Sequence, residues 1–175
     1  MRCDLYGRGQ APGGIGFGPP VTPPVIKQLL IANAIVFLAQ YAGMIPMRAL
    51  AASPAAFWTQ GFLWQPFTYM WLHGGLGHVA MNMFSLWMFG WQLALVWGPQ
   101  RFLRFYLICG VGAGLIIVTY PWIPVLLGMA SPMSLAIPTL GASGAVFGVW
   151  RATPPAWPDR PILFFFPPVA FRAIW

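Results

Sequence analysis

Apolar residues along the chain lie in a few long runs separated by Gly, Pro and isolated basic residues. At about 1.5 Å of rise per residue, the first run is about 31 Å long as a helix, which matches a hydrocarbon core about 30 Å thick. A fourth run (LGASGAVFGVW) ends at Arg151 and is soon followed by Pro154-Pro155, so it is too short to span as it stands. The pattern predicts helices at 25–45, 78–97, 102–120 and 140–150.

The segments around these helices differ in composition. Residues 1–24 are rich in Gly and Pro and contain no apolar core of a signal peptide, which predicts a disordered tail. Residues 46–77 are dense in aromatic side chains, a composition typical of a segment lying in the membrane interface. Residues 151–175 form a divergent C-terminal segment. Its apolar part, 162–170 (ILFFFPPVA), is expected to be interfacial or disordered.

Composition supports a membrane protein. Of the 175 residues, 59% are hydrophobic and only 6% charged, too few to solvate a soluble domain. The only carboxylates are Asp4 and Asp159, which excludes paired-carboxylate catalysis and oxygen-rich Ca²⁺ or Mg²⁺ sites. Cys3 and Cys109 have neither the number nor the spacing of a disulfide framework or a zinc site, and are expected to be free thiols.

The net charge of +7 comes from basic residues scattered singly among apolar runs, not from a patch that would bind nucleic acid. The four predicted crossings place eight of the nine basic residues on one side, against Arg48 on the other. The positive-inside rule then predicts a multi-pass protein with a cytosolic N-terminus, which we place in a bacterial inner membrane.

Four polar residues in or beside the membrane segments are candidates for chemistry, because polar side chains are costly there. His78 and Asn82 are four positions apart and share one helix face. Ser143 lies in GASGA at a helix start, where free N–H groups and the helix dipole favour a developing anion. The fourth is His73. Small residues at Gly141, Ala142, Gly144 and Gly148 allow close approach of a neighbouring helix.

Each residue taken alone also has a structural interpretation. A Ser between glycines often bonds back to its own helix, and GASGA is not the G-x-S-x-G motif of soluble hydrolases. Two His residues without a third ligand make a poor metal site. Asn82 can serve as an interhelical hydrogen-bonding group, and Gly110 and Gly114 as packing residues.

Taken in order, the motifs WQPFTYMWLHGGLGHVAMN, FG followed by WGPQRFLRFY, GVGAG and GASGAVFG resemble the rhomboid family of intramembrane serine proteases over about residues 25–150. The resemblance implies an all-α membrane bundle of six helices, of which this chain carries about four. It further implies that Ser143 is the nucleophile and that His78 and Asn82, with the Ser143 N–H, form the oxyanion hole. His73 would support the loop that precedes the second helix. The resemblance implies no cofactor.

The sequence departs from the family at several positions. In the family a His on the sixth helix activates the serine, whereas the two His residues here both precede the third helix. Gln65 and Ala94 stand where family members commonly carry Arg and an acidic residue. After Val149, WRATPPAWPDR replaces the rest of the fourth helix, which suggests a truncated or frameshifted coding sequence.

Two functions therefore remain open. The first is a rhomboid-type endopeptidase that cleaves transmembrane protein substrates, inactive as this chain stands because the general base is missing. The second is a non-enzymatic pseudoprotease or fragment that binds membrane helices. The expected partners are these substrates or helices and the lipid bilayer, with no nucleic acid. A pore is disfavoured, because no intramembrane charge lines a path.

Overall fold

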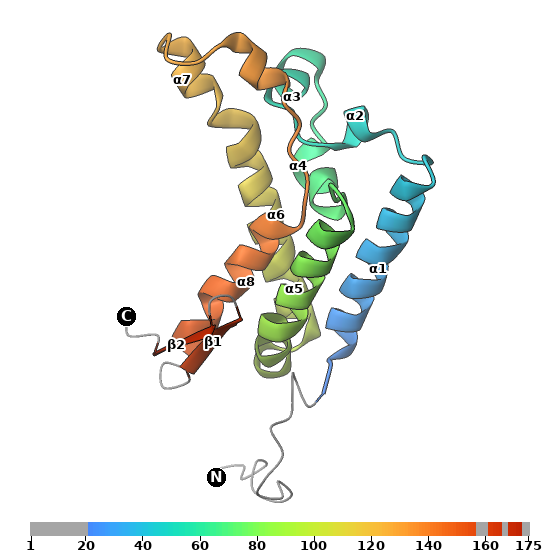
Figure 1. The fold of residues 1–175 in the computed structure, drawn as a ribbon, viewed down its shortest axis with the longest axis vertical. Coiled ribbons are helices and arrows are strands. Elements are labelled where there is room, and N and C mark those ends of the chain that lie inside the picture. The colour runs from blue at the N-terminus through green and yellow to red at the C-terminus, as the bar shows by residue number, and fades with distance from the viewer. Residues whose placement is uncertain (1–20, 157–160, 166–167, 173–175) are drawn as a thin grey trace, which may run out of the picture.

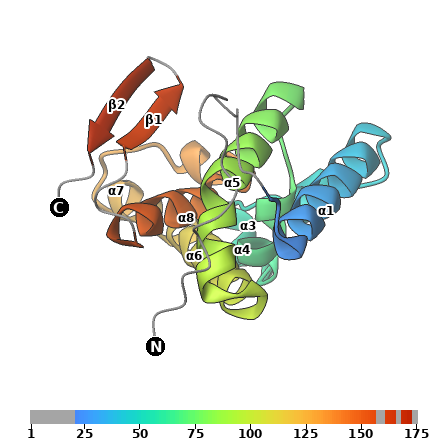
Figure 2. The same cartoon turned by 90° about the horizontal axis from the view of Figure 1, so that it is seen from below.

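The structure, a computed structural model, describes residues 21–156, 161–165 and 168–172. Three long helices and a shorter one pack side by side (Figure 1). Seen from below, α5 lies between α1 on one side and α6 and α8 on the other (Figure 2). These helices are α1 (Pro24–Tyr41), α5 (Leu76–Trp97), α6 (Pro99–Thr119) and α8 (Ser143–Ala156).

Short elements gather at the end of the bundle opposite the start of α1 (Figure 1). Four of them connect α1 to α5: α2 (Met47–Leu50), α3 (Pro54–Gln60), α4 (Gln65–Thr68) and the 3₁₀ turn η1 (Tyr69–Trp71). Two more connect α6 to α8: α7 (Trp122–Leu126) and the 3₁₀ turn η2 (Pro132–Ala136).

The three long helices coincide with the predicted apolar runs, with shifted ends. By length and composition, 24–41, 76–97 and 99–126 are the candidate membrane spans among the described residues. The first helix stops at Tyr41, earlier than the predicted residue 45, because the chain turns at Gly43 with a φ of 72°. The third begins earlier than residue 102, at Pro99, since proline is well tolerated in a first helical turn.

The fourth helix differs from its prediction at both ends. It begins at Ser143 instead of residue 140, because Gly141, with a φ of 129°, still belongs to the preceding turn. It also continues through Arg151 to Ala156, so the predicted end at residue 150 is wrong. Arg151 is exposed and the Thr153 hydroxyl donates to the Val149 carbonyl at 2.9 Å, so neither side chain interrupts the helix. With 14 residues, α8 is about 21 Å long, shorter than a bilayer core.

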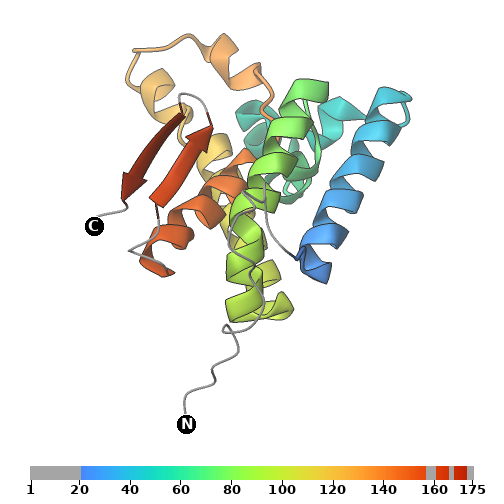
Figure 3. The same ribbon diagram turned by 60° about the horizontal axis from the view of Figure 1, so that its bottom comes forward.

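The stretch expected to be interfacial or disordered contains two antiparallel strands, β1 (Pro161–Phe165) and β2 (Pro168–Arg172), so the disordered alternative is wrong and the interfacial location stays a prediction. Figure 3 shows this hairpin as a separate pair of strands following α8. Aromatic and branched residues favour strands, and each proline stands first in its strand, where a missing donor is tolerated. The expectation of disorder gave too much weight to the prolines. The N-terminal tail, 1–20, lies outside the described residues.

A seam of small residues joins α8 to α6. A Cβ added to Gly148 would lie 2.6 Å from the Cys109 Cβ, and one added to Gly144 would lie 2.5 Å from the Ala113 Cβ. The predicted close approach of the fourth helix to a neighbour is therefore confirmed, with α6 as that neighbour. Because lipid is as apolar as the helix surfaces, such van der Waals contact is what holds helices together in a membrane. The seam fixes where α8, and hence Ser143, lies.

Candidate active site around Ser143

Ser143 is the first residue of α8, and its side chain is exposed. The helix begins at this point because the Val146 N–H donates to the Ala142 carbonyl at 3.0 Å. The N–H groups of a first helical turn have no partner within the helix, and the positive end of the helix dipole lies beside them. Among the described residues, the Ser143 hydroxyl has no hydrogen bond. It is available to a substrate.

Gly141 is the point where the Ser143 and His78 side chains converge. A Cβ at Gly141 would lie 2.8 Å from His78 Nε2 and 3.8 Å from Ser143 Oγ. Both polar atoms therefore lie within 4 Å of one point beside the Gly141 backbone. Only glycine suits this position, since its φ of 129° and the proximity of the imidazole both exclude a side chain.

The hydrogen bond at the other ring nitrogen of His78 determines what Nε2 can do. The Gly74 N–H donates to His78 Nδ1 at 3.3 Å. A neutral imidazole that accepts at Nδ1 carries its proton on Nε2. His78 therefore presents a donor, not an acceptor, toward the space beside Ser143, which suits an oxyanion.

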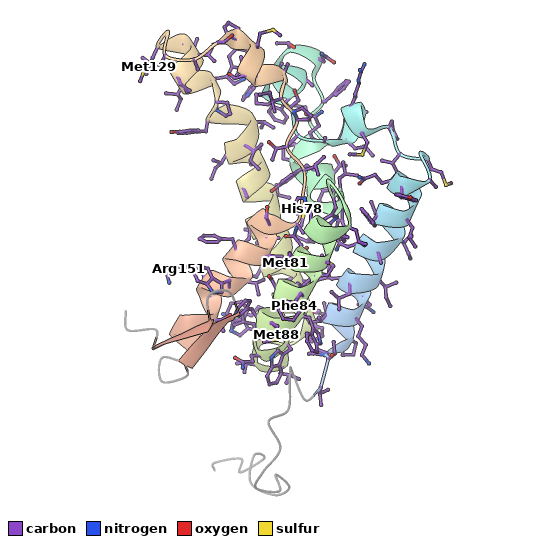
Figure 4. The ribbon with its side chains drawn as sticks, viewed as in Figure 1. His78, Met81, Phe84, Met88, Met129 and Arg151 are labelled. Carbon is purple, nitrogen blue, oxygen red and sulfur yellow. The ribbon has the colours of Figure 1, made fainter. Side chains whose placement is uncertain are left out.

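Asn82 lies one turn further along α5 and is buried. Its Nδ2 donates to the His78 carbonyl at 3.0 Å, an interaction within the helix. The second Nδ2 hydrogen is left for another acceptor. Figure 4 shows His78 near the upper end of α5, with Met81, Phe84 and Met88 following it along the helix. Within the described chain, no hydrogen bond joins the Asn82, His78 and Ser143 side chains to one another.

His73 lies against His78, with ring centroids 5.4 Å apart in an edge-on arrangement. It is fully buried, and neither ring nitrogen has a hydrogen-bond partner among the described residues. Burial and, to a lesser extent, repulsion from His78 lower the His73 pKa to about 4, against a smaller opposing effect of the Trp71 backbone. His73 is therefore neutral at pH 7, and its ring packs edge-on against the His78 ring.

The backbone of His73 is held by a residue that the sequence analysis did not select. Gln40, near the end of α1, accepts from the His73 N–H at 3.1 Å and donates through Nε2 to the His73 carbonyl. The signal was available, because Gln40 is one of few polar residues in the first apolar run.

Tyr69 is a second positioning residue that the sequence did not indicate. Its carbonyl accepts from the Gly141 N–H at 3.0 Å, and its hydroxyl donates to the Gly110 carbonyl of α6 at 2.8 Å. One buried tyrosine thus connects η1, α6 and the turn that precedes Ser143.

A backbone pairing fixes the same turn from the other side. Ala52 and Thr139 form an isolated antiparallel bridge, with N–H to carbonyl distances of 2.9 and 2.8 Å. Gln65, noted above only as a departure from the family, accepts from the Ser53 N–H at 3.1 Å.

In the part of the chain that the structure describes, no group of three or more His, Cys, Asp or Glu residues could hold a metal ion.

Comparison with known proteins decides the family. The Rhomboid domain model matches residues 60–175, well over half of the chain. The chain belongs to the rhomboid family. With its apolar helices, this rhomboid protein is an integral membrane protein. The match includes residues 151–175, so the boundary drawn at residue 150 stays a prediction.

Curated relatives agree with this assignment. This rhomboid protein is 34% identical over 97 residues to rhomboid protein 1, mitochondrial, of Saccharomyces cerevisiae, covering 55% of this chain and 26% of that protein. It is 32% identical over 100 residues to the rhomboid protease GluP of Bacillus subtilis, covering 57% and 17% of the two chains. RHOMBOID-like protein 1 of Arabidopsis thaliana is 36% identical over 90 residues, covering 51% and 20%.

The chain thus spans only 17–26% of the length of these three relatives. They come from a yeast, a bacterium and a plant, so the bacterial inner membrane stays a prediction.

Proposed function

We propose that the residues around Ser143 are the nucleophile and oxyanion part of a rhomboid-type serine endopeptidase that acts on transmembrane protein substrates. The observation that carries this proposal is the convergence of Ser143 Oγ and His78 Nε2 beside Gly141, with His78 Nδ1 accepting from Gly74. A hydroxyl beside an imidazole N–H at a helix start is an arrangement suited to acyl transfer.

In the proposed reaction, Ser143 Oγ attacks the carbonyl carbon of the scissile peptide and loses its proton to a base. The negative charge that develops on the carbonyl oxygen is stabilised by His78 Nε2–H, the second Asn82 Nδ2 hydrogen and the Ser143 N–H. The proton then passes to the leaving amine, and water hydrolyses the acyl-enzyme. One donor of this kind is worth about 3–4 kcal/mol of transition-state stabilisation.

The proposed reaction needs a base that neither histidine supplies. His78 Nδ1 is already an acceptor for Gly74, and its Nε2 carries the proton. His73 is buried against His78, and its low pKa makes it a weak base. Without a base, about four to six decades of rate are lost. We therefore expect the 175-residue chain to be inactive until another segment or chain supplies a base.

Active-site labelling tests this proposal. The purified chain in liposomes is expected to react with a fluorophosphonate probe no faster than its Ser143→Ala variant, and not to cleave a rhomboid substrate. The same chain joined to helices of an active rhomboid protease that carry its base His should react at Ser143 and cleave. Labelling of the unmodified chain that Ser143→Ala abolishes would show that His73 or His78 acts as base. A folded chimera that fails to react would refute the assignment of Ser143.

The alternative, a helix-binding protein without activity, is favoured by the exposed α8 surface beside the serine. Phe147, one turn after Ser143, is 61% exposed and lies on α8, which packs against α5 and α6. A photo-crosslinking residue at Phe147 that captures the same transmembrane helix in the wild type and in Ser143→Ala, with no cleavage in any chimera, would favour binding alone.

We further propose that the start of α1 faces the cytosol. In the described helices, basic residues lie at the end of the bundle where α1 and α6 begin and toward which α8 runs (Figure 1), whereas Arg48 in α2 lies at the opposite end. Cys109 is first replaced in the protein. In intact cells, the new cysteine of a Thr59→Cys variant should then react with an impermeant maleimide added outside. Cys3 should react only after the cells are lysed. The reverse pattern would invert the topology.

A further inference from the structure

The connection between α6 and α8 carries an apolar surface that the proposed active site does not use. This α7–η2 segment, residues 120–139, follows α6, whose 21 residues already extend about 31 Å, the thickness of a bilayer core. Its first residues, up to Leu126, are the end of the third candidate span, 99–126, so the segment begins near the boundary of the hydrocarbon. From residue 105 to residue 150 the chain contains no Asp, Glu, Lys, Arg or His, so no charge draws the segment into water.

One side of the segment packs against the protein. Trp122 Nε1 donates to the Pro54 carbonyl at 3.4 Å, and Ser53 Oγ donates to the carbonyl of the buried Leu135 at 3.2 Å. The other side presents six apolar side chains that are each more than half exposed: Ile123, Leu126, Leu127, Met129, Met133 and Ile137. Figure 4 shows Met129 at the outermost end of the molecule, far from Arg151.

Many backbone N–H groups of the α7–η2 segment have a hydrogen-bond partner within the protein. The N–H groups of Gly128, Met129 and Ala130 donate to carbonyls of α7, and the Thr139 N–H donates to Ala52. Prolines at positions 121, 124, 132 and 138 remove four further donors. Irregular backbone is tolerated near hydrocarbon only when its polar groups are paired in this way.

The two serine hydroxyl groups of the segment form hydrogen bonds within it. Ser131 Oγ accepts from the Met133 N–H at 3.3 Å, and Ser134 Oγ donates to the Ser131 carbonyl at 2.7 Å. A specific protein interface usually combines aromatic or Arg anchors with several hydrogen bonds. The exposed side of this segment offers flexible aliphatic and thioether side chains instead, a composition that suits lipid acyl chains.

We propose that the α7–η2 segment lies in the lipid interface at the Ser143 end of the bundle, with its six exposed apolar side chains in contact with acyl chains. It extends the apolar surface of α6 sideways along the membrane, with Tyr120 and Trp122 at the level where aromatic residues are enriched. Because Thr139 pairs with Ala52 just before Gly141, this lipid contact also sets the depth of Ser143.

Site-directed spin labelling of the full chain in liposomes tests the proposal independently of any protease activity. In a background with Cys3→Ser and Cys109→Ala, single cysteines replace Leu126 and Met129. A cysteine in place of Ile108, which is exposed in the middle of α6, serves as the lipid reference. A cysteine in place of Gln100, which is exposed at the start of α6, serves as the water reference. Collision rates with oxygen and with a polar nickel complex are measured at each site.

At positions 126 and 129, the ratio of oxygen to nickel collisions is expected to exceed that at Gln100 several-fold and to approach that at Ile108. A ratio equal to that at Gln100 would place the segment in water and overturn the proposal. Suppression of both collision rates would also overturn it, because it would mean that protein covers the surface. Loss of that suppression on dilution with lipid would identify the cover as a second copy of this chain.

Discussion

Helix α8 has two neighbouring stripes that differ in how the chain completes them. Along one stripe, Gly144 and Gly148 lie so close to α6 that an added methyl group would meet Ala113 or Cys109 at about 2.5 Å. Along the adjacent stripe, one residue earlier in each turn, Ser143 and Phe147 are exposed. The first stripe determines the position of the helix, and the second stripe is not covered by the described chain. The candidate nucleophile therefore has a fixed position and an open environment.

The packed stripe should be the more sensitive of the two. In Gly148→Ala, the new methyl group would contact the Cys109 Cβ, which cannot move without its backbone. Overpacking of this kind costs about 1–3 kcal/mol, occasionally more, so we expect the free energy of unfolding in detergent to fall by about 3 kcal/mol.

Gly112→Ala is the matched control for this change. Gly112 also lies in α6, but an added Cβ there has nothing within 4 Å, so its unfolding free energy should be unchanged or slightly raised. Adding Cys109→Gly to Gly148→Ala should restore part of the loss. Equal effects of the alanine substitutions at Gly148 and Gly112 would refute the close seam.

Lowering the pH should destabilise the protein through His73, which precedes α5 and packs against His78. The His73 pKa is lowered from 6.5 in the unfolded chain to about 4, so the unfolded state binds the proton more readily. The resulting stability is fully present above pH 6.5 and is lost as the pH falls toward 4, by up to about 3 kcal/mol. The unfolding free energy of the wild type and of His73→Phe should therefore be measured from pH 7.5 to 4. The variant, which cannot titrate there, should show a smaller slope, and identical slopes would contradict the buried neutral histidine.

Gly141 connects the two stripes, since it precedes α8 and contacts His78. Gly141→Ala adds a Cβ about 2.7 Å from His78 Cε1 and places alanine at a φ of 129°, so we expect a loss of about 1–3 kcal/mol in the unfolding free energy. NMR of a ring-labelled sample should also show a shifted His78 signal. Gly75→Ala is the control, because its extended backbone and open surroundings accept a methyl group. An unshifted His78 signal in Gly141→Ala would argue against the contact.

The smallest effect is expected on the open stripe itself. Ser143→Ala removes an exposed hydroxyl that has no hydrogen bond in the described chain, so the unfolding free energy should change by less than about 0.5 kcal/mol. The same substitution should abolish labelling in a chimera that carries a base. A large stability loss would instead make Ser143 a packing residue, the structural interpretation weighed from the sequence.

The sequence predicted the parts of the fold that follow from local chemistry. Apolar length identified three helices, and small residues identified the packed stripe. Their ends were less accurate, because the turns at Gly43 and Gly141 depend on backbone angles that composition does not reveal. The end of α8 was misplaced because an exposed Arg151 near a helix terminus does not stop a helix.

The candidate site was only partly predictable, for a related reason. His78, Asn82 and Ser143 were selected by residue type and spacing, but the bond from Gly74 to His78 Nδ1 joins a loop to a helix and leaves no trace in the pattern. Gln40 contacts a residue 33 positions away, and Tyr69 contacts one 41 positions away. Such long-range contacts become visible only once the helices are packed.

The tautomer of His78 tests the central claim most directly, because it separates an oxyanion donor from a general base. The sequence contains two histidines, so His73→Phe leaves His78 as the single source of imidazole signals. Nitrogen NMR of that variant in lipid at neutral pH should show a proton on Nε2 and none on Nδ1. A proton on Nδ1, with Nε2 free to accept one from Ser143, would contradict the account and make His78 the base.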